Sequence, residues 1–298
     1  MVETILTLMF IIFIGFWAKR IFKKEDKDTL SKFVFSFTMP ALIFSSLYKN
    51  PPEGSFWEII VGVWIISIIV GTIALIIGKI LKLPRTTQAS LFLVTTGGNV
   101  TFMGYPILEK LYGNSGLTLG IIYDQLGMIT FIYIIGFLII QFLTTEGDFS
   151  WKFISKRFIS NPPLWGLIAG LLLKPVPFPN FIIESVSLLG RATTPIMMFV
   201  LGLSLEKPKE SNKIFPIVSG LILKLIALPF FAYLLTFLLS IHGLSAKVFV
   251  IQSAMPSMLF SLVLAIQFNL DYVFTSQVIF YSTLLSLITL NLWIEVIK

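Results

Sequence analysis

Two prolines, Pro106 and Pro256, lie inside apolar stretches of the sequence, and polar residues stand beside each of them. Asn99, just before the first proline, offers a carbonyl acceptor and two amide donors. Proline removes a helical donor and clashes with the preceding turn, so free backbone groups are expected beside these side chains. In a membrane, such groups are tolerated only where protein or a wet cavity covers them. The sequence therefore predicts a solute site built from two interrupted helices.

The candidate solute contacts are residues on the two breaks, together with polar residues near two further prolines. They are Asn99, Val100, Thr101, Gly104, Pro106, Gln252, Ser253, Pro256, Ser257, Thr38, Thr194 and Arg191. Asn99 is expected to bind solute, and it also suits a helix cap. Helix starts near Val100 and Ser257 carry partial positive charge, so their backbone amides are expected to hold a carboxylate. The polar side chains of the second break suit capping and ligand contact equally.

Three ionisable residues within the apolar stretches are candidates for a functional role. Asp124 is expected to face a partner or a wet cavity, because a carboxylate inside a membrane is expensive. It either couples Na⁺ or H⁺, or it is a structural counter-ion to Lys224. Arg191 either clamps a carboxylate or extends towards the outer interface.

Thr38 and Thr194 accompany Pro40 and Pro195 in two other apolar stretches. Proline leaves a carbonyl one turn earlier without its donor, and a threonine hydroxyl can supply a substitute. We expect the hydroxyls of Thr38, Thr193 and Thr194 to bond freed carbonyls, with solute contact as a second role for Thr38 or Thr194.

Composition excludes several classes of protein. The chain is 56% hydrophobic and 12% charged, and it contains no cysteine and one histidine. Disulfides, thiol chemistry and Cys/His metal clusters are therefore excluded. No basic face with interleaved aromatic residues accompanies the net charge of +7, so no nucleic-acid partner is expected. No phosphate-binding glycine loop or catalytic constellation is visible, so neither ATP hydrolysis nor enzymatic activity is expected.

Apolar runs of roughly 20 residues match the length that crosses a hydrocarbon core of about 30 Å. We expect ten spans, at residues 4–22, 31–49, 56–81, 87–112, 117–143, 159–175, 180–205, 214–241, 246–268 and 272–297. With the N-terminus outside, the cytoplasmic loops hold 15 of the 22 Lys and Arg residues and the outer loops hold 5. This bias predicts a multi-pass protein of the cytoplasmic (inner) membrane with both termini outside.

An internal repeat relates residues 38–44 to residues 193–199, at an offset of about 155 residues. The same offset lays each of the first five spans on one of the last five. Because five is odd, the second copy must enter the membrane upside down. We therefore expect an all-α membrane protein of two inverted five-helix repeats, residues 1–143 and 159–298, joined by a cytoplasmic linker at 144–158. Broken helices four and nine are expected to cross.

The first break, Asn99 to Pro106, resembles the Asn-x-x-x-Met-Gly-x-Pro motif of the auxin efflux carrier family. Residues 254–256 and 161–164 are similar to its break in span nine and its opening of span six. The resemblance covers the whole chain. It implies a scaffold of spans 1, 2, 6 and 7, and a transport domain of spans 3–5 and 8–10. It also implies a homodimer through the scaffold, and movement of small organic anions such as auxin-like or malate- and malonate-like carboxylates.

These observations together lead us to expect a secondary active transporter working by alternating access. The rival is a Na⁺- or H⁺-coupled carrier or antiporter of the same crossed-helix design, with Asp124 as its ion site. No cofactor is expected beyond such a coupling ion. A channel would require repeated polar rings along a pore, and the sequence has no such pattern.

Overall fold

The computed structural model describes residues 2–52, 56–144, 155–156, 158–204 and 213–298. Regular structure in these ranges is helical, apart from one isolated β-bridge. Six helical stretches are long and apolar enough to cross a membrane: Glu25–Lys49, Trp57–Ile80, Val100–Thr144, Asn180–Ser204, Ile214–Leu238 and Tyr272–Val296. Two shorter apolar helices are Thr7–Ala18 and Pro162–Leu172. The chain is thus an all-helical membrane protein, while the number of ten spans stays a prediction.

The chain forms two compact units. The first comprises Met1–Ser55, Thr101–Gln125 and Ser155–Glu206, and the second comprises Phe56–Val100, Leu126–Ile154 and Lys207–Lys298. Their boundaries cut through the predicted fourth and fifth spans. The division into two repeats and into scaffold and transport domains therefore stays a prediction. Most of the expected linker, 145–154 and 157, lies outside the described residues.

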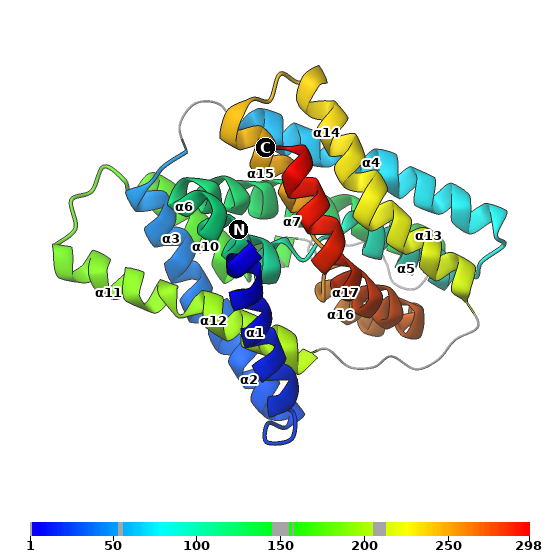
Figure 1. Cartoon of the computed structure of the whole chain (residues 1–298), viewed down its shortest axis with the longest axis horizontal. Coiled ribbons are helices and arrows are strands. Elements are labelled where there is room, and N and C mark those ends of the chain that lie inside the picture. The colour runs from blue at the N-terminus through cyan, green and yellow to red at the C-terminus, as the bar shows by residue number, and fades with distance from the viewer. Residues whose placement is uncertain (1, 53–55, 145–154, 157, 205–212) are drawn as a thin grey trace. The chain divides into compact units, whose positions relative to one another are not determined.

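The first unit consists mainly of seven helices. They are α1 (Val2–Ala18), α2 (Lys24–Phe33), α3 (Met39–Lys49), α6 (Tyr105–Ile122), α10 (Pro162–Leu172), α11 (Asn180–Arg191) and α12 (Thr193–Ser204). In Figure 1, α1 crosses α12, and α3 packs against α10 and α11. A Cβ at Gly166 would lie 2.6 Å from the carbonyl oxygen of Pro40, which shows that α10 comes very close to α3. The Gly166-x-x-x-Gly170 face is therefore used for packing within the chain.

The second unit is built around α5 (Arg85–Thr96), in which residues 87–96 are all buried. The other helices of this unit are α4 (Trp57–Ile80), α7 (Ile129–Phe131), α8 (Phe137–Thr144), α13 (Ile214–Ile222), α14 (Leu228–Leu238), α15 (Gly243–Ser253), α16 (Phe260–Gln267) and α17 (Tyr272–Val296). Helix α5 contacts α4, α8, α13, α16 and α17, while α13 and α14 run beside α4 (Figure 1).

Five short π-helical turns interrupt these helices. They are η1 (Val34–Thr38), η2 (Val100–Gly104), η3 (Tyr123–Met128), η4 (Ile132–Gly136) and η5 (Leu223–Ala227). Three of them end two residues before a proline, and those prolines are Pro40, Pro106 and Pro229. A proline has no N–H for the carbonyl one turn back and its ring crowds that carbonyl, so a locally widened turn accommodates the ring.

Helix α6 is interrupted at Gly113, where φ is +64° and ψ is −158°. Glycine adopts this backbone conformation without the steric cost that a Cβ would bring. The interruption falls in the loop expected between residues 112 and 117. It divides the long apolar stretch Val100–Thr144 where the sequence predicts a change of direction.

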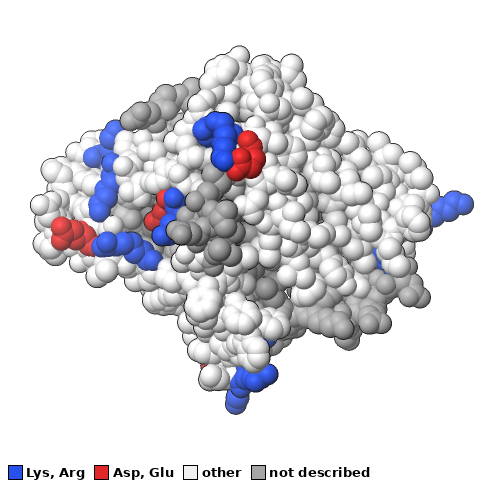
Figure 2. All heavy atoms as spheres, viewed as in Figure 1, with Lys and Arg blue, Asp and Glu red and all other residues white. Residues whose placement is uncertain are grey.

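Large apolar side chains cover much of the surface. Phe215 is 80% exposed, and Phe142 and Leu238 are each 78% exposed. On the face drawn in Figure 2, Lys, Arg, Asp and Glu side chains occupy few places between wide uncharged areas. Such a surface suits contact with lipid and would make a water-soluble protein associate.

Candidate functional site

Two helix breaks meet inside the second unit. Residues 97–99 separate α5 from η2, and residues 254–259 separate α15 from α16. Gly98 and Ser257 form an antiparallel β-bridge between the two breaks. The break at residues 97–99 and the break at residues 254–259 therefore face each other, whereas Pro106 lies beyond the first break, in α6.

The breaks supply each other's backbone hydrogen bonds. The Asn99 N–H donates to the Pro256 carbonyl at 2.6 Å, and the Met258 N–H donates to the Gly97 carbonyl at 3.1 Å. Backbone groups released by the broken helices must be satisfied in an apolar interior, and here each break satisfies the other. Main-chain bonds thus hold the two breaks together. We call this bridged pair, residues 97–99 and 254–259, the crossing.

The second half-helix begins later than expected. We predicted a helix start near Ser257, but α16 begins at Phe260. Ser257 is drawn into the bridge with Gly98, and its N–H donates to Ser282 Oγ at 3.1 Å. The amides of Ser257 and Met258 are therefore already used within the protein, and an anion site at this helix start stays a prediction.

Asn99 and Lys224 are the polar side chains that stand out at this crossing. Asn99 is 3% exposed, and its amide Nδ2 has no hydrogen-bond partner among the described residues. Lys224, in η5, is completely buried and donates from Nζ to the carbonyl of Ser253 at 3.2 Å. One unpartnered amide and one ammonium thus lie beside the bridged breaks.

The other polar residues of the second break are buried and take part in bonds within the unit. Ser253 Oγ donates to the Phe249 carbonyl at 2.8 Å, within its own helix. Ser257 Oγ donates to the Val94 carbonyl at 2.7 Å and so ties this break to α5. Gln252 and Pro256 are also buried. The serine hydroxyls therefore stabilise the crossing, and ligand contact by them stays a prediction.

Of the predicted site residues that directly follow the first break, all but Val100 belong to the first unit. Val100 begins η2 and is completely buried, and Gly104 is its last residue. Pro106 is buried at the second position of α6. Thr101 faces another predicted residue, because its hydroxyl donates to Asp124.

A buried carboxylate forms a second polar cluster, within the first unit. Asp124 Oδ2 accepts hydrogen bonds from Thr101 Oγ1 at 2.7 Å, Tyr105 Oη at 2.6 Å and Gln125 Nε2 at 3.0 Å. Its other oxygen, Oδ1, has no partner among the described residues, and neither does Gln125 Oε1. Two buried oxygens of consecutive residues are thus left able to accept a proton or a cation. The predicted pairing of Asp124 with Lys224 stays a prediction.

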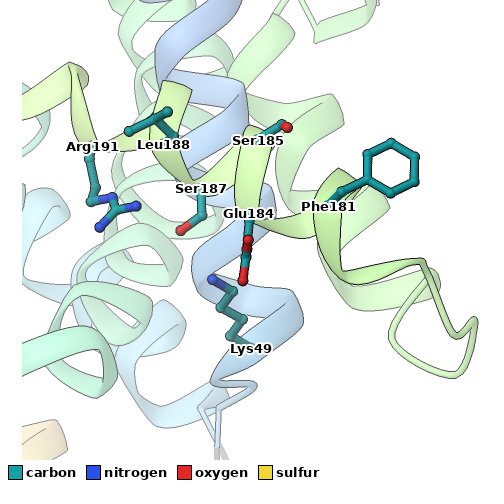
Figure 3. A pocket seen from close by; sticks show the side chains of 7 residues that line it. All are labelled: Lys49, Phe181, Glu184, Ser185, Ser187, Leu188 and Arg191. Carbon is teal, nitrogen blue, oxygen red and sulfur yellow. The ribbon is translucent and has the colours of Figure 1, made fainter.

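Arg191 lies in the last turn of α11, where it lines two cavities of the first unit, of about 530 and 260 Å³. Lys49 and Ser187 line both cavities with it. Figure 3 shows Lys49 and Glu184 facing each other across the larger cavity, with Arg191 at its side. Arg191 is exposed, and the carboxylates of Glu184 and Glu109 line the larger and the smaller of these two cavities, respectively. Its role as a substrate clamp stays a prediction.

The two predicted threonines behave differently. Thr38 is completely buried. Its Oγ1 lies 3.5 Å from the carbonyl oxygen of Val34, at the outer limit of a hydrogen bond. Thr194 donates instead to Glu109 Oε2 at 3.2 Å. Its hydroxyl therefore links α12 to α6 rather than satisfying a backbone carbonyl freed by Pro195, and that part of the expectation is wrong.

Sequence reasoning missed Tyr105, Gln125 and Ser282. Thr101 and Tyr105 are four residues apart, so they lie on one helix face, and this spacing was the available signal for two hydroxyls converging on one acceptor. Ser282 lies in the middle of α17, and nothing in the sequence connects it to the second break.

The chain is similar to known proteins along almost its whole length. A family model described as membrane transport protein matches residues 1–294. An uncharacterized transporter of Methanocaldococcus jannaschii is 30% identical over 302 residues, which cover 98% of this chain and 97% of that protein. One of Methanothermobacter thermautotrophicus is 31% identical over 298 residues, covering 98% and 96%. The uncharacterized transporter YfdV of Escherichia coli is 23% identical over 305 residues, covering 98% and 96%. With matches along nearly its whole length, the chain belongs to the membrane transport protein family, which is the auxin efflux carrier family.

Proposed function

We propose that this membrane transporter is a secondary active carrier of a small organic anion, with its solute site at the crossing of the two breaks. The observation that carries the proposal is the buried Asn99 amide, which has no partner among the described residues although it lies beside two bridged breaks. Buried polar groups are normally hydrogen-bonded, so an unpartnered donor there suits a carboxylate, auxin-like or malate- and malonate-like. Export and uptake are both compatible with this site.

The proposed architecture has ten spans in two inverted repeats, with both termini outside the cytoplasmic membrane. Within each unit, loops expected on one side of the membrane are connected. Lys213 and Asp271 form an ion pair, and they belong to two predicted cytoplasmic loops. Tyr48 Oη donates to the Val176 carbonyl at 2.8 Å, near two predicted outer loops. Alternating access by a transport domain moving against a dimeric scaffold is part of the same proposal.

The proposal is tested by replacing the unpartnered amide. Asn99→Ala should lower the initial rate of carboxylate uptake into proteoliposomes by at least about tenfold, because it removes a hydrogen bond to a charged group. The matched control is Asn291→Ala, since Asn291 Nδ2 bonds the Leu287 carbonyl within α17. Unchanged uptake by folded Asn99→Ala protein would remove this residue from the site.

A second candidate function is a Na⁺- or H⁺-coupled carrier or antiporter with Asp124 as the ion site. The observation that favours it is the pair of buried, unpartnered oxygens, Asp124 Oδ1 and Gln125 Oε1. Three donors already satisfy Asp124 Oδ2, so the free Oδ1 is the atom that would take a proton or a cation. Oxygen ligands of this kind suit hard cations.

Asp124→Asn tests the coupling role. The substitution preserves shape and removes the charge, so uptake should lose its dependence on an imposed Na⁺ or pH gradient while the protein stays folded. Uptake is measured in proteoliposomes with and without each gradient, and Asp28→Asn in the exposed part of α2 is the control. A lower melting temperature with an intact gradient dependence would instead assign Asp124 a structural role.

A further inference from the structure

The crossing in the second unit holds a buried lysine side chain, Lys224. Lys224 Nζ donates to the carbonyl of Ser253, the last residue of α15 before the second break. The same Nζ would lie 3.2 Å from a Cβ placed on Gly98, in the first break. The ammonium therefore reaches the backbone of both breaks at the point where they bridge.

The Lys224 ammonium has more N–H donors than it has acceptors among the described residues of the second unit. A lysine ammonium carries three N–H groups, and the bond to Ser253 is the only one that Lys224 makes with described residues of the second unit. The side chain is completely buried. An ion taken out of water requires opposite charge or several hydrogen bonds to offset its lost hydration, and one neutral carbonyl supplies neither in full.

Three backbone amides of the two breaks are already used within the protein. The N–H groups of Asn99, Ser257 and Met258 already donate to Pro256, Ser282 and Gly97, respectively. Two side-chain donors at the crossing have capacity left: the ammonium of Lys224, and the Asn99 amide, which is unpartnered among the described residues. One charged donor and one neutral donor suit the two oxygens of a carboxylate.

We propose that Lys224 binds the carboxylate of the transported solute, with the Asn99 amide as the second donor, and that the site selects solutes with a single negative charge. This inference rests on the proposed function and narrows its substrate class. One ammonium balances one carboxylate. A second carboxylate in the same buried space would lack a counter-charge, so a dianion is rejected relative to a monoanion of similar size.

Matched solute pairs test the charge assignment. The probes are acetate and acetamide, benzoate and benzamide, and indole-3-acetate and indole-3-acetamide, titrated into purified protein and followed by calorimetry and thermal shift. In at least one pair the wild-type protein should bind the carboxylate at least about tenfold more tightly than the amide. Lys224→Met should remove this preference, and Lys224→Arg should keep part of it. Lys247→Met, the same substitution elsewhere in the unit, should behave as wild type.

Two further measurements keep the inference open to refutation if Lys224→Met folds poorly. Wild-type protein alone should bind monomethyl malonate more tightly than malonate at neutral pH, because only malonate brings a second charge. Lys224→Gln should also abolish the carboxylate preference. In the absence of solute, Lys224→Met should melt at the wild-type temperature or above it, because the described residues of the second unit lose one hydrogen bond to a neutral carbonyl and a costly buried ammonium.

The contrary results are equally definite. If Lys224→Met or Lys224→Gln retains the carboxylate preference, or if malonate binds as tightly as its monomethyl ester, the inference fails while anion transport stands. If Lys224→Met melts at a lower temperature with its preference intact, Lys224 is a structural counter-ion. If the wild-type protein prefers no carboxylate in any pair and transports none, the inference and the proposed function fail together.

Discussion

At the scale of single residues, Asp271 shows how one carboxylate can secure three elements of the second unit. Its Oδ2 accepts from Lys213 Nζ and from Thr87 Oγ1, and its Oδ1 accepts from the Phe274 N–H at the start of α17. Burial alone would raise the pKa of Asp271. The hydrogen bonds from Lys213, Thr87 and Phe274 outweigh burial and hold that pKa below its ordinary value.

A depressed pKa makes this carboxylate a source of stability that acid removes. The stability is present above the pKa of an unfolded aspartate, about 3.9, and it is lost as the pH falls through the lower folded value. Asp271→Asn should therefore lower the melting temperature at pH 7 by an amount that shrinks below about pH 4. The expected loss at neutral pH is about 1 to 2 kcal/mol, discounted because Lys213 is partly exposed.

The measurement is thermal unfolding of wild-type and variant protein in detergent across this pH range. Asp28→Asn in α2 serves as the control, because Asp28 is exposed. A constant difference between wild type and Asp271→Asn at every pH would show that the charge of Asp271 contributes nothing.

At the scale of elements, both ionisable residues of the candidate sites lie in π-helical turns. Asp124 belongs to η3 and Lys224 to η5. Widened turns of this kind often occur at functional sites, because the extra residue rotates a side chain away from the regular helical face. Pro229, two residues after η5, is the physical cause of the turn that carries Lys224.

Replacing this proline should separate transport from stability. Pro229→Ala restores the missing donor and allows η5 to relax into an α-helical turn, which changes the direction of Lys224. Carboxylate uptake should fall at least about tenfold if the charged hydrogen bond is lost, while the melting temperature stays equal or rises. Pro216→Ala is the control, because Pro216 lies in the first turn of α13, where a proline leaves no carbonyl unsatisfied. Normal uptake by Pro229→Ala protein would contradict the link.

The positions of the breaks could be predicted because proline and glycine disrupt helices locally. Pro256 lies in the second break and Asn99 lies in the first, whereas Pro106 follows the first break in the first turn of α6. The bridge between Gly98 and Ser257 could not be predicted, since the two residues are distant in the chain and only the folded unit brings them together. That long-range pairing also explains why α16 begins three residues later than expected. Likewise, the acceptor of the Thr194 hydroxyl depended on α6 lying beside α12.

At the scale of the whole molecule, the proposed inverted topology makes a direct prediction about sidedness. Residues 28 and 176 lie near equivalent loops of the two proposed repeats, and both are exposed. Inversion places these loops on opposite sides of the membrane. Because the natural chain contains no cysteine, single cysteines can be introduced without a background.

In intact cells, a membrane-impermeant maleimide should label Val176→Cys at once and Asp28→Cys only after permeabilisation. The positive-inside bias is the physical reason, since the loop containing Asp28 is rich in lysine and arginine. His242→Cys, in a predicted outer loop, should follow Val176→Cys. Equal labelling of the Asp28→Cys and Val176→Cys proteins in intact cells would rule out two oppositely oriented repeats.

The mutual bonding of the two breaks also constrains how this protein is made. Ser257 Oγ and its acceptor on Val94 are 163 residues apart, and the bridge at Gly98 has a similar reach. While the ribosome is still synthesising the second half, the Gly97 carbonyl and the Asn99 N–H lack the main-chain partners that the second break supplies. The first break therefore has to stay hydrated or covered by protein during synthesis. The crossing forms only after residue 258 has inserted into the membrane.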